Sequence, residues 1–329
     1  MTLPTSLAEL AYPVLRPLNP QEGYWWAYLA GGLMFAVGVA LWRRRGRGRV
    51  RLATLKGLIG SRRLWLHRST RLDLKLYLMH SALIMFGYGL FETSSQAWQA
   101  GALGGLTTLF GHAPPLVAPR WMVGAATTLL QVLALEFGYW ALHCAFHRIP
   151  ALWELHKVHH SAEVMTPLTE WRQHPIEFAA FANILALSTG AVYGAMAWAF
   201  GPAAQPFTLF QMNVILVIHL ATFHHLRHSG VWIAATGRLG RLVHSPAHHQ
   251  IHHSTDPAHF DRNFGYALSV WDWAFGTLHI PERRGRVKLG LPDAPYAGWV
   301  DTLVRPLRDG AKTLAPKPAG PVAPEGVQS

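Results

Sequence analysis

The sequence predicts an all-α integral membrane protein, a helical bundle of about five membrane segments with a histidine-rich helical cap on the cytoplasmic side. Composition is the first observation behind this fold class. Half of the 329 residues are apolar and only 14% are charged, whereas about a quarter of the residues of ordinary soluble domains are charged. The second observation is the placement of the 20 histidines, most of which gather in short clusters that follow apolar stretches.

Five apolar stretches have the length and composition of membrane helices. Residues 24–42 contain no charge and carry aromatic residues at both ends, and a helix of about 20 apolar residues crosses the hydrocarbon core of a bilayer. The other four stretches lie near 74–92, 121–143, 178–200 and 206–226. Glycine and proline interrupt the stretch 97–117, so we expect a surface or re-entrant piece there rather than a span.

Positive charge predicts which side of the membrane each loop faces. Twelve lysines and arginines lie between Arg43 and Lys75, and basic residues next to a membrane segment indicate the cytoplasmic side. In the loop at 96–120 the only lysine or arginine is Arg120, and the turn near 201–205 contains no charged residue. If the chain crosses the membrane at each of the five spans, the segments after the third and after the fifth span both lie in the cytoplasm. These two segments contain the histidine clusters. The net charge of +12 would also suit nucleic acid. Because the arginines directly follow an apolar span, however, we expect the membrane, and no nucleic acid, as the partner.

Four histidine clusters have the spacing of metal ligands. Residues three and four apart share one face of a helix, so the patterns HxxxH and HxxHH place two or three imidazoles side by side. Ten imidazoles are too many for a single ion, which takes about four to six ligands, and suit two ions. The single cysteine, Cys144, leaves no thiolate-rich site within one chain, and we interpret it as a packing residue. The expected metal ligands are His143, His147, His156, His159, His160, His224, His228, His249, His252 and His253.

Several neighbouring side chains leave alternatives open. His225 is a substitute for His224 as a ligand, and His174 is either a ligand or a residue that supports one. We interpret His219 as an ordinary hydrogen-bonded histidine, with a ligand role as the alternative. Metal-bound imidazoles normally donate their second N–H to an acceptor, and Asp272 is the best candidate for that acceptor. We interpret the other nearby carboxylates as helix caps or surface ion pairs: Glu163, Glu170, Glu177, Asp256 and Asp261.

At these residues the sequence resembles the fatty acid hydroxylase and sterol desaturase superfamily, membrane-bound enzymes with a histidine-box di-iron centre. The resemblance rests on the histidine clusters and extends to WRQHPIEF at 171–178. It also includes RNFGYALSVWDWAFGT at 262–277, which is similar to the closing signature of that family. Together these segments cover roughly residues 75–282.

The resemblance implies an oxidoreductase whose chemistry takes place at a di-metal centre of two iron ions. It implies O₂ as co-substrate, electrons from a separate cytochrome- or ferredoxin-like protein, and hydroxylation or desaturation of a lipid from the bilayer. A sterol, a fatty acyl chain or a related lipid would be the substrate. The expected location is the inner membrane of a bacterium, with the active site on the cytoplasmic side.

The same reasoning divides the chain into three parts. Residues 1–72 form an N-terminal segment with one transmembrane helix and a basic cytoplasmic loop, and residues 73–282 form the catalytic domain. Residues 283–329 form an extension that ends in a disordered tail rich in proline, alanine and glycine. Imidazole suits zinc as well as iron. A membrane zinc-dependent hydrolase and a non-catalytic metal-binding membrane protein are therefore the alternative functions.

Overall fold

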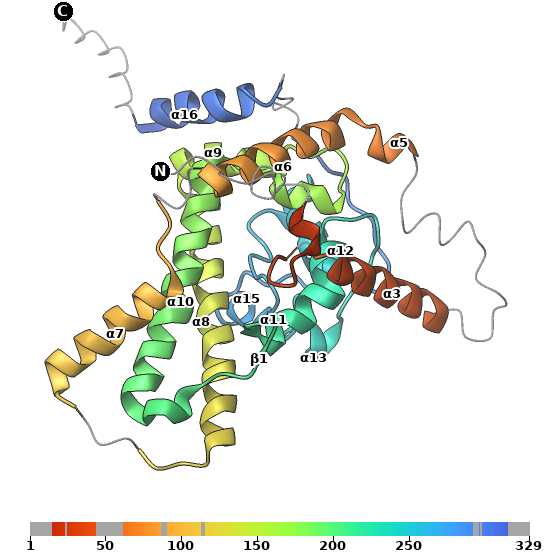
Figure 1. The fold of residues 1–329 in the computed structure, drawn as a ribbon. Helices are drawn as coiled ribbons and strands as arrows, with labels where there is room; N and C mark the ends of the chain where they lie inside the picture. The colour runs from red at the N-terminus through yellow and green to blue at the C-terminus, as the bar shows by residue number, and fades with distance from the viewer. Residues whose placement is uncertain are drawn as a thin grey trace, which may run out of the picture.

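The computed structural model describes residues 15–23, 25–43, 62–86, 91–112, 116–291, 296 and 298–314. These residues are mostly helical, which confirms the predicted all-α class (Figure 1). The described strands are β1, Thr208–Leu209, and β2, Met212–Asn213, which pair antiparallel in a short hairpin. Most of the basic loop, residues 44–61, and the expected disordered tail, from residue 315 onward, lie outside the described residues.

Three helices are long and apolar enough to cross a membrane. They are α3, Trp26–Arg43; α8, Arg120–Arg148; and α10, Pro175–Phe200, which the short helix η4, Gly201–Ala204, extends. They correspond to the first, third and fourth expected spans. Figure 1 shows α8 and α10 lying side by side, and the two helices pack against each other.

The other two expected spans are not among the helices of membrane-spanning length in the described residues. α6, Arg68–Phe86, carries four charged side chains among its first eight residues, and charges are costly in the bilayer core. In Figure 1, α6 lies across the end of the bundle where α9 is found. The fifth stretch forms the helical run 214–227, made of α11, Val214–His219, the π-helical turn η5, Leu220–His224, and α12, His225–Arg227. This run is apolar but shorter than 18 residues.

A further helix, α7, Ser95–Phe110, occupies most of the stretch that we expected to be a surface or re-entrant piece. The hydroxyl oxygen of Ser94 caps it by accepting a hydrogen bond from the Ala97 N–H. α7 packs along α10, because Gly190 and Gly194 leave room for it. A Cβ at either glycine would overlap the backbone of α7.

The histidine-bearing segments surround the second half of α8. α9, Pro150–His160, follows α8 after one residue and lies at the end of α8 and α10 (Figure 1). The other elements of this region are short. They are η3, Pro167–Trp171; α13, Gly237–Gly240; α14, Pro246–His252; η6, Pro257–His259; and α15, Val270–Ala274.

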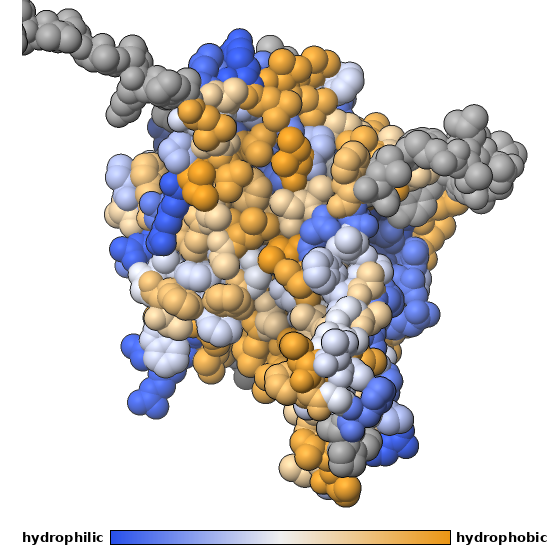
Figure 2. Space-filling model, turned by 90° about the vertical axis from the view of Figure 1, so that its left-hand side faces the viewer, coloured by the Kyte–Doolittle hydropathy of each residue, from blue (hydrophilic) through white to orange (hydrophobic). Residues whose placement is uncertain are grey.

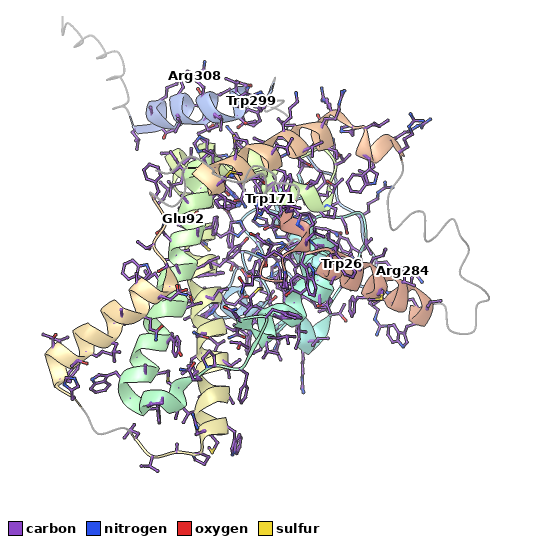
Figure 3. The ribbon with its side chains drawn as sticks, viewed as in Figure 1. Trp26, Glu92, Trp171, Arg284, Trp299 and Arg308 are labelled. Carbon is purple, nitrogen blue, oxygen red and sulfur yellow. The ribbon has the colours of Figure 1, made fainter. Side chains whose placement is uncertain are left out.

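The remaining helices lie near the surface. Near the N-terminus are η1, Arg16–Leu18, and α5, Arg62–Trp65. Near the C-terminus, α16, Asp301–Leu314, lies over α9. Figure 3 shows Arg308 of α16 pointing away from the molecule, whereas Trp171 lies buried in the packed interior beneath α6.

A large hydrophobic surface accompanies the three long helices. Figure 2 shows a broad hydrophobic area on one face, with hydrophilic residues mostly at its edges. The exposed apolar side chains include Trp121, Leu129 and Phe137 on α8 and Met34 and Trp42 on α3. Exposed apolar surface of this extent indicates contact with lipid or with another protein. Together with three helices of membrane-spanning length, it identifies a membrane protein.

Candidate metal centre

The structure gathers nine of the ten expected histidine ligands into two adjacent groups, which we name site A and site B. Within each group, one ring nitrogen of every histidine lies within 4.8 Å of those of the others. Site A consists of His143, His147, His156, His160 and His252. Site B consists of His159, His228, His249 and His253.

The two HxxHH motifs each divide their histidines between the sites. On α9, His156 and His160 lie four residues apart and belong to site A, whereas His159 belongs to site B. The motif HQIHH, which includes the end of α14, does the reverse, because only its middle histidine belongs to site A. The rings of His160 and His253 stack with their centroids 4.4 Å apart. The two sites therefore share a wall.

The other ligands come from the ends of helices. His143 and His147 lie one turn apart at the end of α8 and complete site A. His228 completes site B from the position just after α12, where its backbone leaves the helical conformation.

Hydrogen bonds fix the tautomers of three site A histidines. Nδ1 of His143 lies 2.9 Å from the carbonyl oxygen of Phe264, and Nδ1 of His252 lies 2.9 Å from that of Arg262. A carbonyl oxygen only accepts, so both Nδ1 atoms carry the proton. Nδ1 of His156 lies 2.6 Å from a carboxylate oxygen of Glu177, the kind of acceptor that metal-bound histidines commonly have.

Site B has the same arrangement. Nδ1 of His159 donates to the carbonyl oxygen of Arg172 at 3.2 Å, and Nδ1 of His228 lies 2.9 Å from a carboxylate oxygen of Glu170. In these five histidines, three of site A and two of site B, Nε2 is left as the metal-binding nitrogen.

The Nε2 atoms converge in a way that suits metal ions. Nε2 of His143 lies 3.1 Å from Nε2 of His156. In site B, Nε2 of His228 lies 3.3 Å from that of His159 and 2.8 Å from that of His249. When Nδ1 holds the proton, two facing Nε2 atoms have no hydrogen to share, and their lone pairs repel. Two nitrogens bound about 2.1 Å from one ion are separated by about 3.0–3.4 Å. The pairs His143–His156 and His159–His228 lie in this range and the pair His228–His249 is slightly closer, so both sites suit a metal.

Burial keeps these imidazoles neutral. Burial, followed by the charges of neighbouring histidines, lowers the pKa of His159, His160 and His253 well below the ordinary histidine value. The neutral form is the one that binds a metal. The clusters are therefore packed donor sets rather than a solvated, pH-responsive surface.

Glu170 is a site residue that sequence reasoning interpreted as a cap or a surface pair. Burial alone would raise the pKa of this carboxyl, but the guanidinium of Arg227 and the nearby His224 and His228 hold it well below its usual range. Glu170 also forms a two-point ion pair with Arg227, which is itself buried. The signal available in the sequence was only its position between two histidine clusters.

Asp272, the expected acceptor, does not contact a ligand directly but supports site A through the backbone of Phe264. Its carboxylate accepts hydrogen bonds from the backbone N–H groups of Phe264 and Gly265, at 2.9 and 2.8 Å, and from the hydroxyl of Thr277. It therefore fixes the segment whose Phe264 carbonyl receives Nδ1–H of His143. The acceptors that contact ligands directly are Glu170, Glu177 and backbone carbonyls.

The structure does not bring His224 into either site. Its Nδ1 lies 3.0 Å from the hydroxyl of Tyr266, and only His228 of the third cluster contributes a ligand. The expectation assumed an α-helix, in which residues four apart share a face. The π-helical turn η5 contains His224, and α12 ends at Arg227, so the two histidines point in different directions.

The histidines whose roles were left open also lie outside both sites. Nδ1 of His174 accepts from the Ile176 N–H and caps α10, and its Nε2 hydrogen-bonds the Leu303 carbonyl. The ring of His219 packs against Tyr266, with the centroids 4.9 Å apart. His225 is buried beside His224.

A cavity of about 330 Å³ opens onto both sites. Three histidines of site A and His253 of site B line it, together with the apolar side chains of Trp153, Phe260 and Leu291. Asp261 stands at the same cavity, with a carboxylate oxygen 3.7 Å from Nδ1 of His147. A small molecule could therefore reach both groups of imidazoles through one opening.

Comparison with known proteins agrees with this geometry. Residues 128–277 match the family model described as fatty acid hydroxylase. The chain is 29% identical over 167 residues to the alkylglycerol monooxygenase of Xenopus tropicalis, which covers 50% of this chain and 33% of that protein. It is 28% identical over 199 residues to an ornithine lipid hydroxylase of Rhizobium tropici, with 60% and 55% covered. It is 28% identical over 179 residues to a very-long-chain aldehyde decarbonylase of Oryza sativa subsp. indica, with 52% and 27% covered.

The matched region contains every member of sites A and B as well as the closing signature. The match supports the resemblance of this chain to the fatty acid hydroxylase superfamily. The chain spans between about a quarter and about half of the length of these relatives. No solved structure matches.

Proposed function

We propose that this protein is a membrane-bound, iron-dependent oxidoreductase that uses O₂ to hydroxylate or desaturate a lipid. The observation that carries the proposal is the convergence of unprotonated Nε2 atoms, such as those of His143 and His156, in two adjacent all-imidazole sites. The names of the relatives support lipid oxidation. Two of them, a monooxygenase and a hydroxylase, favour hydroxylation over desaturation.

The chain would contribute the metal cage and its surroundings. Nine neutral imidazoles would hold the ions. Glu177, Glu170 and the backbone carbonyls would keep five of these rings, those of His143, His156, His159, His228 and His252, in the tautomer that presents Nε2. Two iron ions held there would activate O₂ with electrons from a separate cytochrome- or ferredoxin-like protein, so that one oxygen atom enters a C–H bond and the other leaves as water. The burial of all the site B ligands keeps bulk water away from the reacting groups.

The surroundings favour a substrate from the bilayer. Three helices of spanning length and the exposed apolar surface of α8 would hold the protein in the membrane. Trp153, Phe260 and Leu291 would give the cavity at the two sites an apolar wall suited to a lipid chain. The basic stretch after α3 supports a cytoplasmic location of the centre in a bacterial inner membrane.

Metal analysis of the purified protein tests the identity of the ions. We expect iron at two ions per chain, and a His249→Ala variant should lose iron from site B. His112→Ala is the matched control, because His112 is exposed and belongs to neither site. Zinc at the same stoichiometry, with no lipid oxidation, would instead support a hydrolase.

Lipid analysis tests the reaction. Lipid extracts from cells that express the protein should contain a product heavier than its parent by one oxygen atom, and growth under ¹⁸O₂ should label that atom. Cells that express His156→Ala should lack the product, and cells that express His112→Ala should retain it. A product lighter by two hydrogen atoms would indicate desaturation. Full iron loading without any changed lipid would favour a non-catalytic metal-binding protein.

A further inference from the structure

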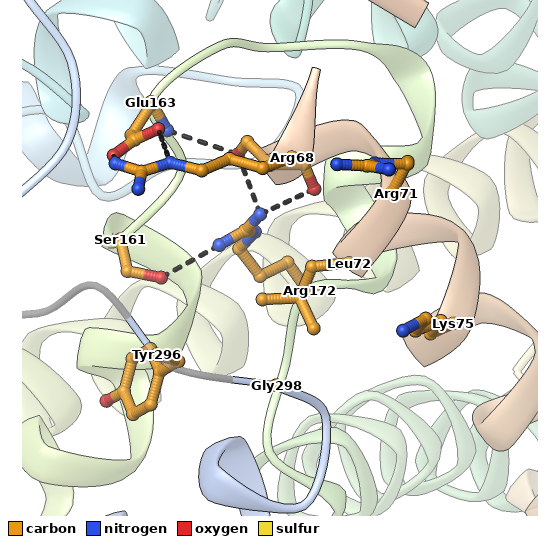
Figure 4. A pocket seen from close by; sticks show the side chains of 10 residues that line it. Arg68, Arg71, Leu72, Lys75, Ser161, Glu163, Arg172, Tyr296 and Gly298 are labelled. Carbon is orange, nitrogen blue, oxygen red and sulfur yellow. Dashed lines mark hydrogen bonds and ion pairs between the residues drawn. The ribbon is translucent and has the colours of Figure 1, made fainter. Parts of the chain in front are cut away.

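A second cavity, of about 540 Å³, is separate from the one at the metal sites. α6 forms one wall, the segment after α9 forms another, and Tyr296 and Gly298 lie on a third side (Figure 4). We propose that this pocket binds a phosphate group, such as that of a glycerophospholipid headgroup or of inorganic phosphate. We name it the basic pocket. The cationic side chains that line it are Arg68, Arg71, Lys75 and Arg172.

Two of these four cations already have carboxylate partners. Arg68 forms a two-point ion pair with Glu163, the carboxylate that lines the basic pocket. Arg172 Nε donates to Asp73 at 2.6 Å, and both of these side chains are buried. Because these two pairs are close to neutral, the net charge of the basic pocket depends on its other two cations.

Arg71 and Lys75 have no ionic partner among the described residues, and Figure 4 shows both of them without an interaction to the other lining side chains. They are four residues apart on α6, so they lie on one face of the helix. Two uncompensated positive charges in a concave site attract an anion. A guanidinium and an ammonium group are the side chains that proteins use most for phosphate.

The floor of the basic pocket is already ordered. The guanidinium of Arg172 donates to the hydroxyl oxygens of Ser69 at 2.7 Å and Ser161 at 3.0 Å, and also to the Ser69 carbonyl. These contacts hold Arg172 without the help of a ligand. A ligand therefore has to order only the exposed side chains of Arg71 and Lys75, which lowers the entropic cost of binding.

The same helix favours a lipid over free phosphate as the source of the anion. Leu74 and Leu78 are 46% and 48% exposed, and their spacing places them on the same side of α6 as Arg71 and Lys75. Alternating basic and apolar residues are typical of a helix that lies in the membrane interface. A headgroup phosphate in the basic pocket would leave its acyl chains beside these two leucines.

The basic pocket contains Arg172, whose backbone contacts a ligand of site B, but phosphate binding in the pocket does not depend on the proposed reaction. The backbone carbonyl of Arg172 accepts from Nδ1 of His159, and Ser161 directly follows His160. A bound lipid would thus be anchored close to the metal centre. Binding can be measured without iron turnover, so failure of the proposed oxidation and failure of this inference are distinguishable.

Calorimetric titration of the full chain in detergent tests the inference with three probes: dihexanoyl phosphatidic acid, dihexanoylglycerol and inorganic phosphate. We expect phosphatidic acid to bind and dihexanoylglycerol, which lacks the phosphate, not to bind. Tighter binding of phosphatidic acid than of inorganic phosphate identifies a lipid as the source. Equal affinities identify free phosphate as the ligand.

The double variant Arg71→Gln/Lys75→Gln should bind phosphatidic acid at least about tenfold more weakly, because charge-assisted contacts to phosphate are lost. Both side chains are exposed, and an unchanged melting temperature verifies that the variant folds. Arg62→Gln/Arg63→Gln is the matched control, since it removes the same charge from exposed residues of α5 that do not line the basic pocket. Equal weakening in the two double variants would show only general surface attraction and overturn the inference, as would a wild-type protein that binds neither phosphate probe.

Discussion

A carboxylate oxygen of Glu177 lies 2.6 Å from Nδ1 of His156, and the two side chains are 0% and 2% exposed. The other carboxylate oxygen of Glu177 is buried without a hydrogen-bond partner among the described residues. Glu170, in contrast, divides its charge between Arg227 and His228. Among the ligands, Glu177 therefore acts on a single imidazole, and it should support metal binding at site A by holding His156 in place.

Replacing Glu177 tests this relationship. Glu177→Gln keeps the shape of the side chain but replaces the carboxyl group that contacts Nδ1 of His156 with an amide, so metal affinity at site A should fall by about 10- to 100-fold. A competition titration with a chelator measures the affinity of each site. Glu154→Gln is the control, because Glu154 pairs with Lys157 on the same helix as His156 but contacts no ligand. Unchanged affinity in Glu177→Gln would refute the role given to this contact.

The third histidine cluster offers a comparison within a few residues of sequence. His228→Gln should lose the ion of site B, because it removes one of only four imidazoles there. His224→Gln should keep both ions, since His224 faces Tyr266. Metal content per chain decides between the two positions. Loss of metal from His224→Gln, with retention in His228→Gln, would restore the interpretation drawn from the spacing.

The buried ion pair between Arg172 and Asp73 should contribute strongly to stability. In Arg172→Met the carboxylate of Asp73 stays in the interior without its partner, and the free energy of unfolding should fall by about 3–5 kcal/mol. Denaturant titration in detergent measures the change. The double variant Asp73→Leu/Arg172→Met should recover part of the loss, because no charge is left buried. A double variant less stable than Arg172→Met would contradict this explanation.

The contact between α7 and α10 depends on the absence of side chains. In Gly194→Val the new side chain would collide with the α7 backbone near Gln99, so stability should fall by at least about 1–3 kcal/mol. Thermal unfolding in detergent measures the effect. Gly101→Ala on α7 is the control, because a Cβ there meets open space and alanine favours the helix by about 1 kcal/mol. Equal melting temperatures for the two variants would rule out close packing at Gly194.

Local spacing predicted the ligands well where the chain forms a regular helix. His156 and His160 share a site because residues four apart share a helix face, whatever the rest of the fold does. The same rule misplaced His224, because a π-helical turn is not visible in the spacing of two histidines. The stretch near 74–92 is not among the helices of membrane-spanning length found in the described residues, because its helix begins at Arg68 and the first two turns are charged.

Contacts between distant segments were beyond the reach of sequence reasoning. Glu177 meets His156 only because α9 and α10 fold against each other, and Glu170 meets His228 across two separate segments. Neither carboxylate has a local pattern that distinguishes it from a helix cap. Asp272 was selected because it lies in a recognised signature, and it supports the site through Phe264 rather than by direct contact.

The division of each HxxHH motif between the two sites has a consequence for metal loading. An ion bound at one site orders α9 and thereby also positions the histidine that α9 contributes to the other site. The second ion then binds with a smaller loss of conformational entropy. The ions should therefore load cooperatively. When the metal is limiting, the protein population should consist of empty and doubly loaded chains, with singly loaded chains scarce.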